Sequence, residues 1–232
     1  MTGKPFVAAD LSGAMHVDHD EARQAFLDAL DSFTGCVRGA SDQDLLAASR
    51  CAGWTAGDVV VHVHMGLQEM LLGLVTPAAE AAGTDAASYW RATPPATDED
   101  AGPTDGIRFV RLVGAAYRRP TGAVRHLLPT ADGVRSAVTR LEAGAVRFQG
   151  HVLSTGDFLA TWAVELAIHH LDLRIGAPAP AALRLARRTV EALAGGEVPG
   201  SWPDELAVLL GAGRITPDAA QRSAAPAFPV LG

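Results

Sequence analysis

Two apolar segments of the sequence each carry a histidine and a carboxylate at helical spacing. In the first segment His62 follows Asp58 by four residues, and in the second His169 follows Glu165 by four residues. Side chains four residues apart lie about 40° from one another around a helix, so each pair shares one face. Polar groups on a buried helix are costly unless they are paired or bound to a metal. The spacing therefore predicts a polar stripe on each of two largely buried helices.

If the two stripes face each other, His62, Glu165 and His169 converge. Two imidazoles and one carboxylate are a common ligand set for catalytic zinc and leave a fourth position for water or substrate. Nickel or iron(II) accepts similar ligands. Asp58 and Asp172 share faces with the two histidines, and we predict that they orient the imidazoles through the other ring nitrogens. The same spacing also occurs in exposed, hydrogen-bonded Glu–His pairs, so spacing alone leaves both interpretations open.

The remaining histidines are predicted to lie outside this set. His64 points about 160° away from His62, and His170 about 140° away from Glu165. His151 precedes the second helix, where a surface position is the common outcome and the mouth of a pocket the alternative. Surface positions are expected for His16, His19 and His126.

The elements that position these residues are predicted to be mainly helical. Apolar periodicity and capping signals indicate four principal helices and several shorter elements. The principal helices are expected at 18–39, 55–75, 104–118 and 154–174. Shorter helical pieces are expected at 41–46, 121–127, 132–142, 179–194 and 203–211, with a strand or hairpin at 145–153 and a loop-like tail. Residues 76–104 form a long connection with a helical turn around Tyr89 and Trp90, and connections of this length are often functional or mobile. The expected fold is an all-α four-helix bundle with a short C-terminal helical extension.

We expect three parts along the chain: a flexible lead (1–17), the bundle (18–176) and the extension (177–232).

The composition of the chain is that of a folded protein. The chain has 232 residues, a net charge of −7 and 48 % hydrophobic residues, which suit a folded core. The basic residues are scattered, which argues against a nucleic-acid surface. No apolar run is long enough to span a membrane, and the N-terminus lacks a signal-peptide pattern. Cys36 and Cys51 are expected to be unpaired thiols in a reduced, cytoplasmic protein.

The motifs on the two helices also resemble those of a known family. They read Gly53-Trp54-Thr55-x-x-Asp58-x-x-x-His62 and, about a hundred residues later, Glu165-x-x-x-His169-x-x-Asp172-Leu173. Together they resemble the mycothiol-dependent maleylpyruvate isomerase family, which belongs to the DinB-like superfamily of four-helix metal proteins. The resemblance covers about residues 18–176. The tail segment 209–214 (Leu-Leu-Gly-Ala-Gly-Arg) is similar to the end of many actinobacterial members. Many relatives carry an arginine shortly before the glutamate, where this chain has Trp162.

The resemblance implies a DinB-like bundle, a zinc ion held by His62, Glu165 and His169, and mycothiol as a thiol co-substrate. The chain has a single lysine, Lys4, and is rich in arginine and alanine, which agrees with an actinobacterial, mycothiol-making host. The implied activity is that of an S-transferase or a cis–trans isomerase of the maleylpyruvate isomerase type. In either reaction a metal-activated thiolate attacks a small electrophile.

The sequence leaves the substrate and several alternatives open. Arg91, beside Tyr89 and Trp90 in the long connection, is the candidate for binding an anionic substrate, and a solvated loop position is its alternative. The protein is also compatible with a thiol-independent metal-dependent hydrolase, lyase or cyclase of secondary metabolism, or with a non-catalytic metal-binding stress protein. We expect neither nucleic-acid nor membrane partners, and either a monomer or a homodimer.

Overall fold

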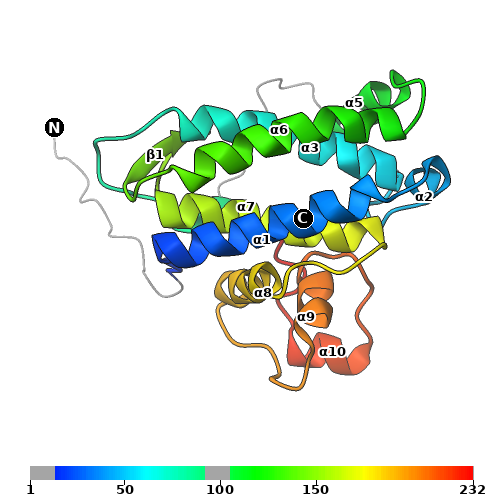
Figure 1. Ribbon diagram of the computed structural model, residues 1–232. Coiled ribbons are helices and arrows are strands. Elements are labelled where there is room, and N and C mark those ends of the chain that lie inside the picture. Colours follow the sequence, from blue (N-terminus) through cyan, green and yellow to red (C-terminus); the bar gives the residue numbers. More distant parts are fainter. Residues whose placement is uncertain (1–13, 92–104, 232) are drawn as a thin grey trace, which may run out of the picture.

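The computed structural model describes residues 14–91 and 105–231, which are mainly helical (Figure 1). The elements are α1 (His19–Arg38), α2 (Asp42–Leu46), α3 (Ala56–Leu74), α4 (Ser88–Arg91), α5 (Asp105–Ala115), α6 (Thr121–Thr139), β1 (Ala145–Phe148), β2 (His151–Ser154), α7 (Thr155–Leu173), α8 (Pro180–Ala194), α9 (Asp204–Gly211) and α10 (Ala219–Ala224). The predicted all-α class is confirmed, and the two strands form one small antiparallel sheet.

The bundle consists of α1, α3, α6 and α7, which pack in the pairs α1–α7, α3–α6, α1–α6 and α3–α7. One of its members differs from the prediction. The helix expected at 104–118 is the short α5, which packs against α3 near α2, and α6 takes its place in the bundle (Figure 1). The two pieces expected at 121–127 and 132–142 form this one continuous helix, with Pro129 inside it.

A proline inside a helix is unfavourable, because it lacks a backbone N–H and crowds the preceding turn. In α6 the apolar residues on both sides of Pro129 are buried in the same core: Leu127 before it, and Ala131 and Val134 after it. Packing against α3 and α1 therefore outweighs the local cost of the proline.

Helix α7 lies at the centre of the molecule. It packs against α1, α3, α8 and α9, and every one of its residues except Glu165 is buried. A helix that is apolar on all sides is expected in such a position. Its start is set by Ser154, whose hydroxyl accepts a hydrogen bond from the Asp157 N–H, and it ends at Arg174 in the left-handed conformation.

The end of the predicted flexible lead is anchored instead. Residues 1–13 of that lead lie outside the described residues, but Met15 and Val17 are both only 6 % exposed. The backbone N–H of Val17 donates to the buried carboxylate of Asp157 at 2.9 Å, and that of Met15 donates to Asp85 at 3.2 Å. Their burial ties this segment to α7 and to the connection before α4.

The predicted hairpin is present at β1 and β2. Its turn residues, Gln149 and Gly150, both have positive φ angles of 47° and 81°, as a tight two-residue hairpin turn requires. Phe148 from β1 packs edge-on against Phe158 of α7, with ring centroids 5.3 Å apart. The hairpin thus closes one end of the space between α3 and α7.

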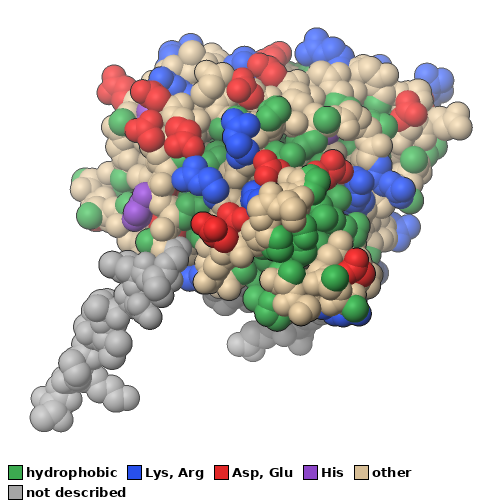
Figure 2. All heavy atoms as spheres, turned by 90° about the horizontal axis from the view of Figure 1, so that it is seen from below, with side chains coloured by type: hydrophobic (Ala, Val, Ile, Leu, Met, Phe, Trp, Pro, Cys, Tyr) green, Lys and Arg blue, Asp and Glu red, His purple; other side chains and the backbone are tan. Residues whose placement is uncertain are grey.

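The C-terminal extension packs on one side of the bundle through α8, which contacts α7 and α1 (Figure 1). The tail is not entirely loop-like, because Asp218 and Gln221 form a capping box that starts α10. On the face shown in Figure 2, acidic and basic side chains are interspersed and form no continuous basic stripe. Cys36 and Cys51 are free thiols, as predicted. None of the described helices is both long and apolar enough to cross a membrane.

Candidate metal centre

The structure brings His62, Glu165 and His169 together from α3 and α7. The Nε2 atoms of His62 and His169 each lie 3.1 Å from the same oxygen, Oε1 of Glu165. The two imidazole rings are 4.6 Å apart between centroids, and all three potential ligand atoms lie within 4.8 Å of one another. The convergence that helical spacing could only suggest is therefore present.

Packing of α3 against α7 explains this geometry. Each helix is largely apolar but carries polar side chains at one place, His62 on α3 and Glu165 and His169 on α7. These polar side chains meet where the two helices contact. Glu165 is the one residue of α7 that is not buried, and its side chain is 25 % exposed. The His62 side chain is 33 % exposed, whereas that of His169 is only 7 % exposed. The group therefore sits at the wall of a cavity, with His169 deepest.

Asp172 lies against the second nitrogen of His169. Nδ1 of His169 donates to Oδ2 of Asp172 at 3.0 Å, and Asp172 is fully buried. The same carboxylate accepts hydrogen bonds from Nε of Arg214 at 2.9 and 3.2 Å and from the Cys51 thiol at 3.0 Å. A carboxylate in this position orients a ligating imidazole, which is the role predicted for Asp172.

The pKa values follow from these contacts. Burial alone would raise the pKa of Glu165, but the charge of His169 and hydrogen bonds from His169 and His62 outweigh it and hold this pKa well below 4.5. Burial alone would lower the pKa of His169, but attraction to Glu165 and the hydrogen bond to Asp172 raise it well above 6.5. For Asp172, burial opposes ionisation, yet its contacts with His169 and Arg214 lower its pKa. These pKa shifts favour the ionised form of both carboxylates and the protonated form of His169 when no metal is bound.

The donor set fits a divalent cation. Because Nδ1 of His169 donates to Asp172, a neutral His169 has the lone pair of Nε2 directed at Oε1 of Glu165. Two lone pairs 3.1 Å apart repel each other unless a proton or a cation lies between them. Ligand atoms around tetrahedral zinc are about 3.3 Å apart, close to both observed distances. A zinc ion would replace the shared proton, as metal binding to histidine generally does.

A second group, formed by Cys51, His169 and Asp172, is also close enough to hold a cation. The guanidinium of Arg214 already bonds to both oxygens of Asp172. A cation in this second group would face that positive charge at short range. Electrostatics therefore favours the group formed by His62, Glu165 and His169.

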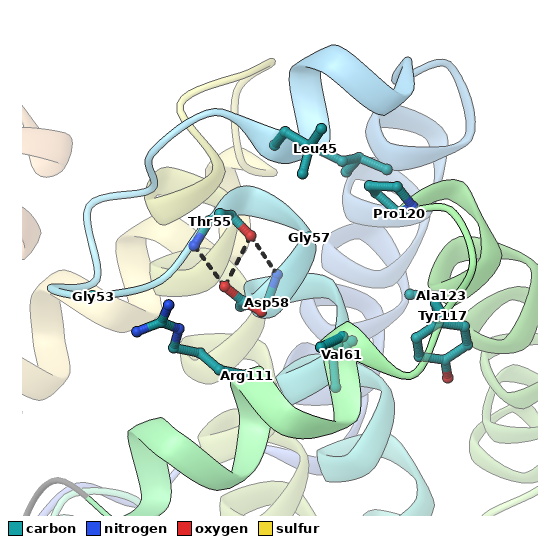
Figure 3. A pocket seen from close by; sticks show the side chains of 13 residues that line it. Leu45, Gly53, Thr55, Gly57, Asp58, Val61, Arg111, Tyr117, Pro120 and Ala123 are labelled. Atoms are coloured by element: carbon teal, nitrogen blue, oxygen red, sulfur yellow. Dashed lines mark hydrogen bonds between the residues drawn. The ribbon is translucent and has the colours of Figure 1, made fainter.

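Asp58 does not lie against His62. Its Oδ2 accepts hydrogen bonds from the N–H and the hydroxyl of Thr55, in the capping box that starts α3 (Figure 3). In the part of the chain that the structure describes, no hydrogen bond joins Asp58 to His62. Asp58 lines a different cavity of about 320 Å³, toward which Arg111 of α5 extends (Figure 3). The prediction that Asp58 orients His62 is therefore corrected: its carboxylate caps the helix.

Arg91 is directed away from the site as well. Its Nη2 donates to the backbone oxygen of Ala192 on α8 at 3.0 Å, and Arg91 lines neither of the two cavities whose walls include His62 and Glu165. His19, expected at the surface, is partly exposed, and both of its ring nitrogens also bond within the protein, to Thr155 and Leu141. His151 pairs with Thr84 and does not reach these cavities.

The larger of these two cavities has a volume of about 490 Å³. His62, Glu165 and His169 form part of its wall, and the rest is largely apolar or aromatic. The other lining residues are Cys51, Ala52, Trp54, Trp90, Ile107, Ile168, Ala212, Arg214 and Leu231. Arg214 is the arginine of this lining. Sequence reasoning noticed it only as the last residue of the Leu-Leu-Gly-Ala-Gly-Arg tail and assigned it no role.

Trp162 lines a smaller cavity of about 210 Å³, whose wall also includes His62 and Glu165. Its ring packs edge-on against Phe148 and Phe158, and a side chain at Gly66 would lie 3.2 Å from it. Glycine at position 66 thus lets α3 approach this indole closely. Trp162 acts here as a wall of the site, between α3 and α7.

Comparisons with known proteins agree with this arrangement. A family model described as the mycothiol maleylpyruvate isomerase N-terminal domain matches residues 26–174, which include His62, Glu165 and His169 but not Arg214. The fold is similar to the crystal structure of the mycothiol-dependent maleylpyruvate isomerase, with a TM-score of 0.53 and 14 % identity over 75 % of this chain and 70 % of that chain. A histidine-to-alanine mutant of that isomerase gives a TM-score of 0.52 and 15 % identity with the same coverage. No curated protein sequence matches the chain. The likeness confirms the predicted DinB-like bundle.

Proposed function

Because the chain belongs to the mycothiol maleylpyruvate isomerase N-terminal domain family, we propose that it is a zinc-dependent enzyme with mycothiol as its thiol co-substrate. Its reaction is S-transfer or cis–trans isomerisation of a small electrophile. The observation that carries this proposal is the convergence of His62, Glu165 and His169 at the wall of a 490 Å³ cavity. All three residues lie in the range that matches the family.

Zinc bound by these three side chains supplies a Lewis acid that lowers the pKa of a thiol, so that a thiolate is available near neutral pH. The protein contributes the orientation of the ligands and a largely apolar wall around them. Asp172 holds the His169 ring with Nε2 toward Glu165. The indoles of Trp54 and Trp90 and the side chain of Ile107 line the cavity, and an apolar wall solvates a sulfur nucleophile less strongly than water does.

Neither candidate reaction requires an oxidant or a reductant. In S-transfer the thiolate sulfur forms a bond to an electrophilic carbon, and the leaving group departs with its bonding electron pair. In isomerisation the thiolate sulfur adds to one carbon of a double bond, and the π electron pair moves to the other carbon. The carbon–carbon single bond left behind rotates, and this electron pair then re-forms the double bond as the thiolate leaves. The volume of the cavity lies in the range that is usual for small-molecule sites.

The test is conjugation of mycothiol to monochlorobimane by the purified protein, with and without a chelator. We expect fluorescence to rise faster than in the enzyme-free control, to fall to that control with chelator, and to return on adding zinc. His169→Ala should abolish this rate. His126→Ala is the matched control, because His126 is exposed on α6 and lines neither cavity.

The other outcomes of this test favour different functions. Zinc-dependent turnover of an electrophile that does not require mycothiol would support a metal-dependent hydrolase, lyase or cyclase. Tight zinc binding without turnover of any electrophile tested would support a non-catalytic metal-binding protein. If His62→Ala retained the zinc affinity of the parent protein, the assignment of the ligands would be wrong.

A further inference from the structure

We propose that Arg214 is a positioning residue of the metal centre, which acts on His169 through Asp172. The C-terminal extension is then an integral part of the site, although the family match ends at residue 174. This inference deepens the proposed function and rests on its zinc-binding part. It does not depend on the identity of the thiol or of the electrophile.

A continuous series of hydrogen bonds leads from Arg214 to the ligand atoms. Nε of Arg214 donates to Oδ1 of Asp172 at 2.9 Å and to Oδ2 at 3.2 Å. Oδ2 accepts from Nδ1 of His169 at 3.0 Å, and Nε2 of His169 lies 3.1 Å from Glu165. A shift of the Asp172 carboxylate would therefore rotate the imidazole and move Nε2 relative to Glu165.

Asp172 needs Arg214 because its carboxylate is fully buried. An ionised carboxylate without water requires partners of opposite charge or several hydrogen-bond donors inside the protein. Arg50 contacts the same end of α7, but its guanidinium donates to the backbone oxygen of Leu171 and lies toward Glu205. Among the described arginines, Arg214 is the one whose guanidinium hydrogen-bonds to Asp172.

The backbone after α9 directs Arg214 toward α7. The N–H of Arg214 donates to the Leu209 oxygen at 2.8 Å, and the N–H of Gly213 donates to the Leu210 oxygen at 3.1 Å. Gly213 has a φ angle of +64°, so these bonds form the Schellman motif that ends a helix and reverses the chain. The side chain is fixed at its far end too, because Nη1 donates to the Ala212 oxygen at 3.0 Å.

This arrangement depends on the planar guanidinium. Arg214 uses Nε for the carboxylate and Nη1 for the backbone oxygen, two directions set by one rigid group. A lysine offers one ammonium, which retains the charge but cannot reproduce both contacts in the same geometry. Glutamine retains neither the charge nor this donor arrangement.

The test is the zinc affinity of the full-length protein, measured by competition with a chromophoric chelator. We expect Arg214→Gln to bind zinc about 10–100-fold more weakly, the range observed when a partner of a metal ligand is lost. Arg214→Lys should give an intermediate value. The matched control is Arg187→Gln. Arg187 is an arginine of the extension with a similar side-chain exposure (16 % against 20 % for Arg214), and it bonds to Glu191 and Asp204 and not to Asp172. Its zinc affinity should stay within about 2-fold of the parent value.

A double-mutant cycle separates positioning from a general structural effect. If Arg214 acts through Asp172, the variant Asp172→Asn/Arg214→Gln should bind zinc no more weakly than Asp172→Asn alone. Parent-like affinity of Arg214→Gln, or additive losses in the double variant, would overturn the inference. If circular dichroism shows that Arg214→Gln is unfolded, Arg214→Lys is measured in its place. Parent-like zinc affinity of Arg214→Lys would then overturn the inference. A parent protein that does not bind zinc would instead refute the proposed function.

Discussion

His62 and His169 lie at the same 3.1 Å distance from one carboxylate oxygen, yet their surroundings differ. His169 is 7 % exposed and its second nitrogen is held by Asp172, which in turn bonds to Arg214 and Cys51. His62 is 33 % exposed and packs against the Trp54 ring, and the described residues offer no hydrogen bond to its second nitrogen. The orientation of His169 is thus fixed by a hydrogen bond to its second nitrogen, whereas the orientation of His62 depends mainly on packing.

The positions of the two aspartates along their helices explain this difference. Asp58 lies in the first turn of α3, where backbone N–H groups lack partners within the helix, so its carboxylate joins the capping box with Thr55. Asp172 lies in the last turn of α7, where no such N–H groups are available and the helix dipole disfavours negative charge. Its carboxylate is therefore free to bond to His169 and Arg214, and it needs their positive charge. An aspartate in the first turn of α3 thus caps its helix, whereas an aspartate in the last turn of α7 bonds to the proposed metal ligand.

The largest expected effect follows from removing His169, the proposed ligand that Asp172 holds. His169→Ala should weaken zinc binding by more than about 100-fold, beyond the range for an outer partner, because it removes a ligand and also leaves Asp172 without one of its partners. His62→Ala should also weaken zinc binding, but by less. Chelator competition measures both values. A larger loss for His62→Ala would reverse the comparison.

The next effect concerns the two aspartates. Asp172→Asn should weaken zinc binding by about 10–100-fold, because the amide cannot replace the ionised acceptor beside His169. Asp58→Asn should leave the zinc affinity within about 2-fold of the parent value, since Asp58 is not bonded to a proposed ligand. The same competition assay applies, with both proteins checked for equal zinc content at saturation. Equal losses for the two variants would refute the asymmetry.

Asp58 should affect stability instead. Asp58→Ala should lower the free energy of unfolding by about 1 kcal/mol, because it removes one half of the capping box at the start of α3. Urea denaturation of the metal-free and zinc-saturated proteins measures this change. The decrease should be the same in both forms. A decrease seen only in the zinc-bound form would place Asp58 in the metal centre after all.

The smallest effect is the pH dependence of the metal-free protein. The pKa of Glu165 is lowered in the folded protein, so its stabilising contribution is present above about pH 4.5 and is lost as the pH falls. The pKa of His169 is raised, so its contribution is fully present below about pH 6.5 and is lost as the pH rises through the folded-state pKa. Together the two contributions should stabilise the metal-free protein most between about pH 4.5 and about pH 6.5. Urea denaturation in the presence of a chelator should show a decline above pH 6.5, which His169→Ala should reduce and His126→Ala should not.

Local periodicity accounts for most of what could be predicted. The spacing of Glu165, His169 and Asp172 placed them on one helical face, and the structure joins them in one hydrogen-bonded series. The capping signals at Thr55 and Ser154 located the starts of α3 and α7. These features depend on contacts three or four residues apart, which a sequence displays directly.

Predictions that required knowledge of distant neighbours were less successful. Two separate pieces were expected at 121–127 and 132–142, but packing of α6 against α3 keeps the helix continuous through Pro129. Arg91 looked available for a substrate, but α8 provides an acceptor for it at Ala192. Met15 was expected in a flexible lead, yet it is buried in the core. In each case a segment far away in the chain supplied the deciding contact.

The sequence by itself determined the all-α class, the polar residues that two buried helices carry and the family to which the chain belongs. Only the tertiary structure decided that His62 meets Glu165 across 103 residues, and that Arg214 meets Asp172 across 42. The reason is physical. Helical geometry relates residues within one turn of each other, whereas contacts between distant segments follow from how the whole core packs and which buried charges require a partner.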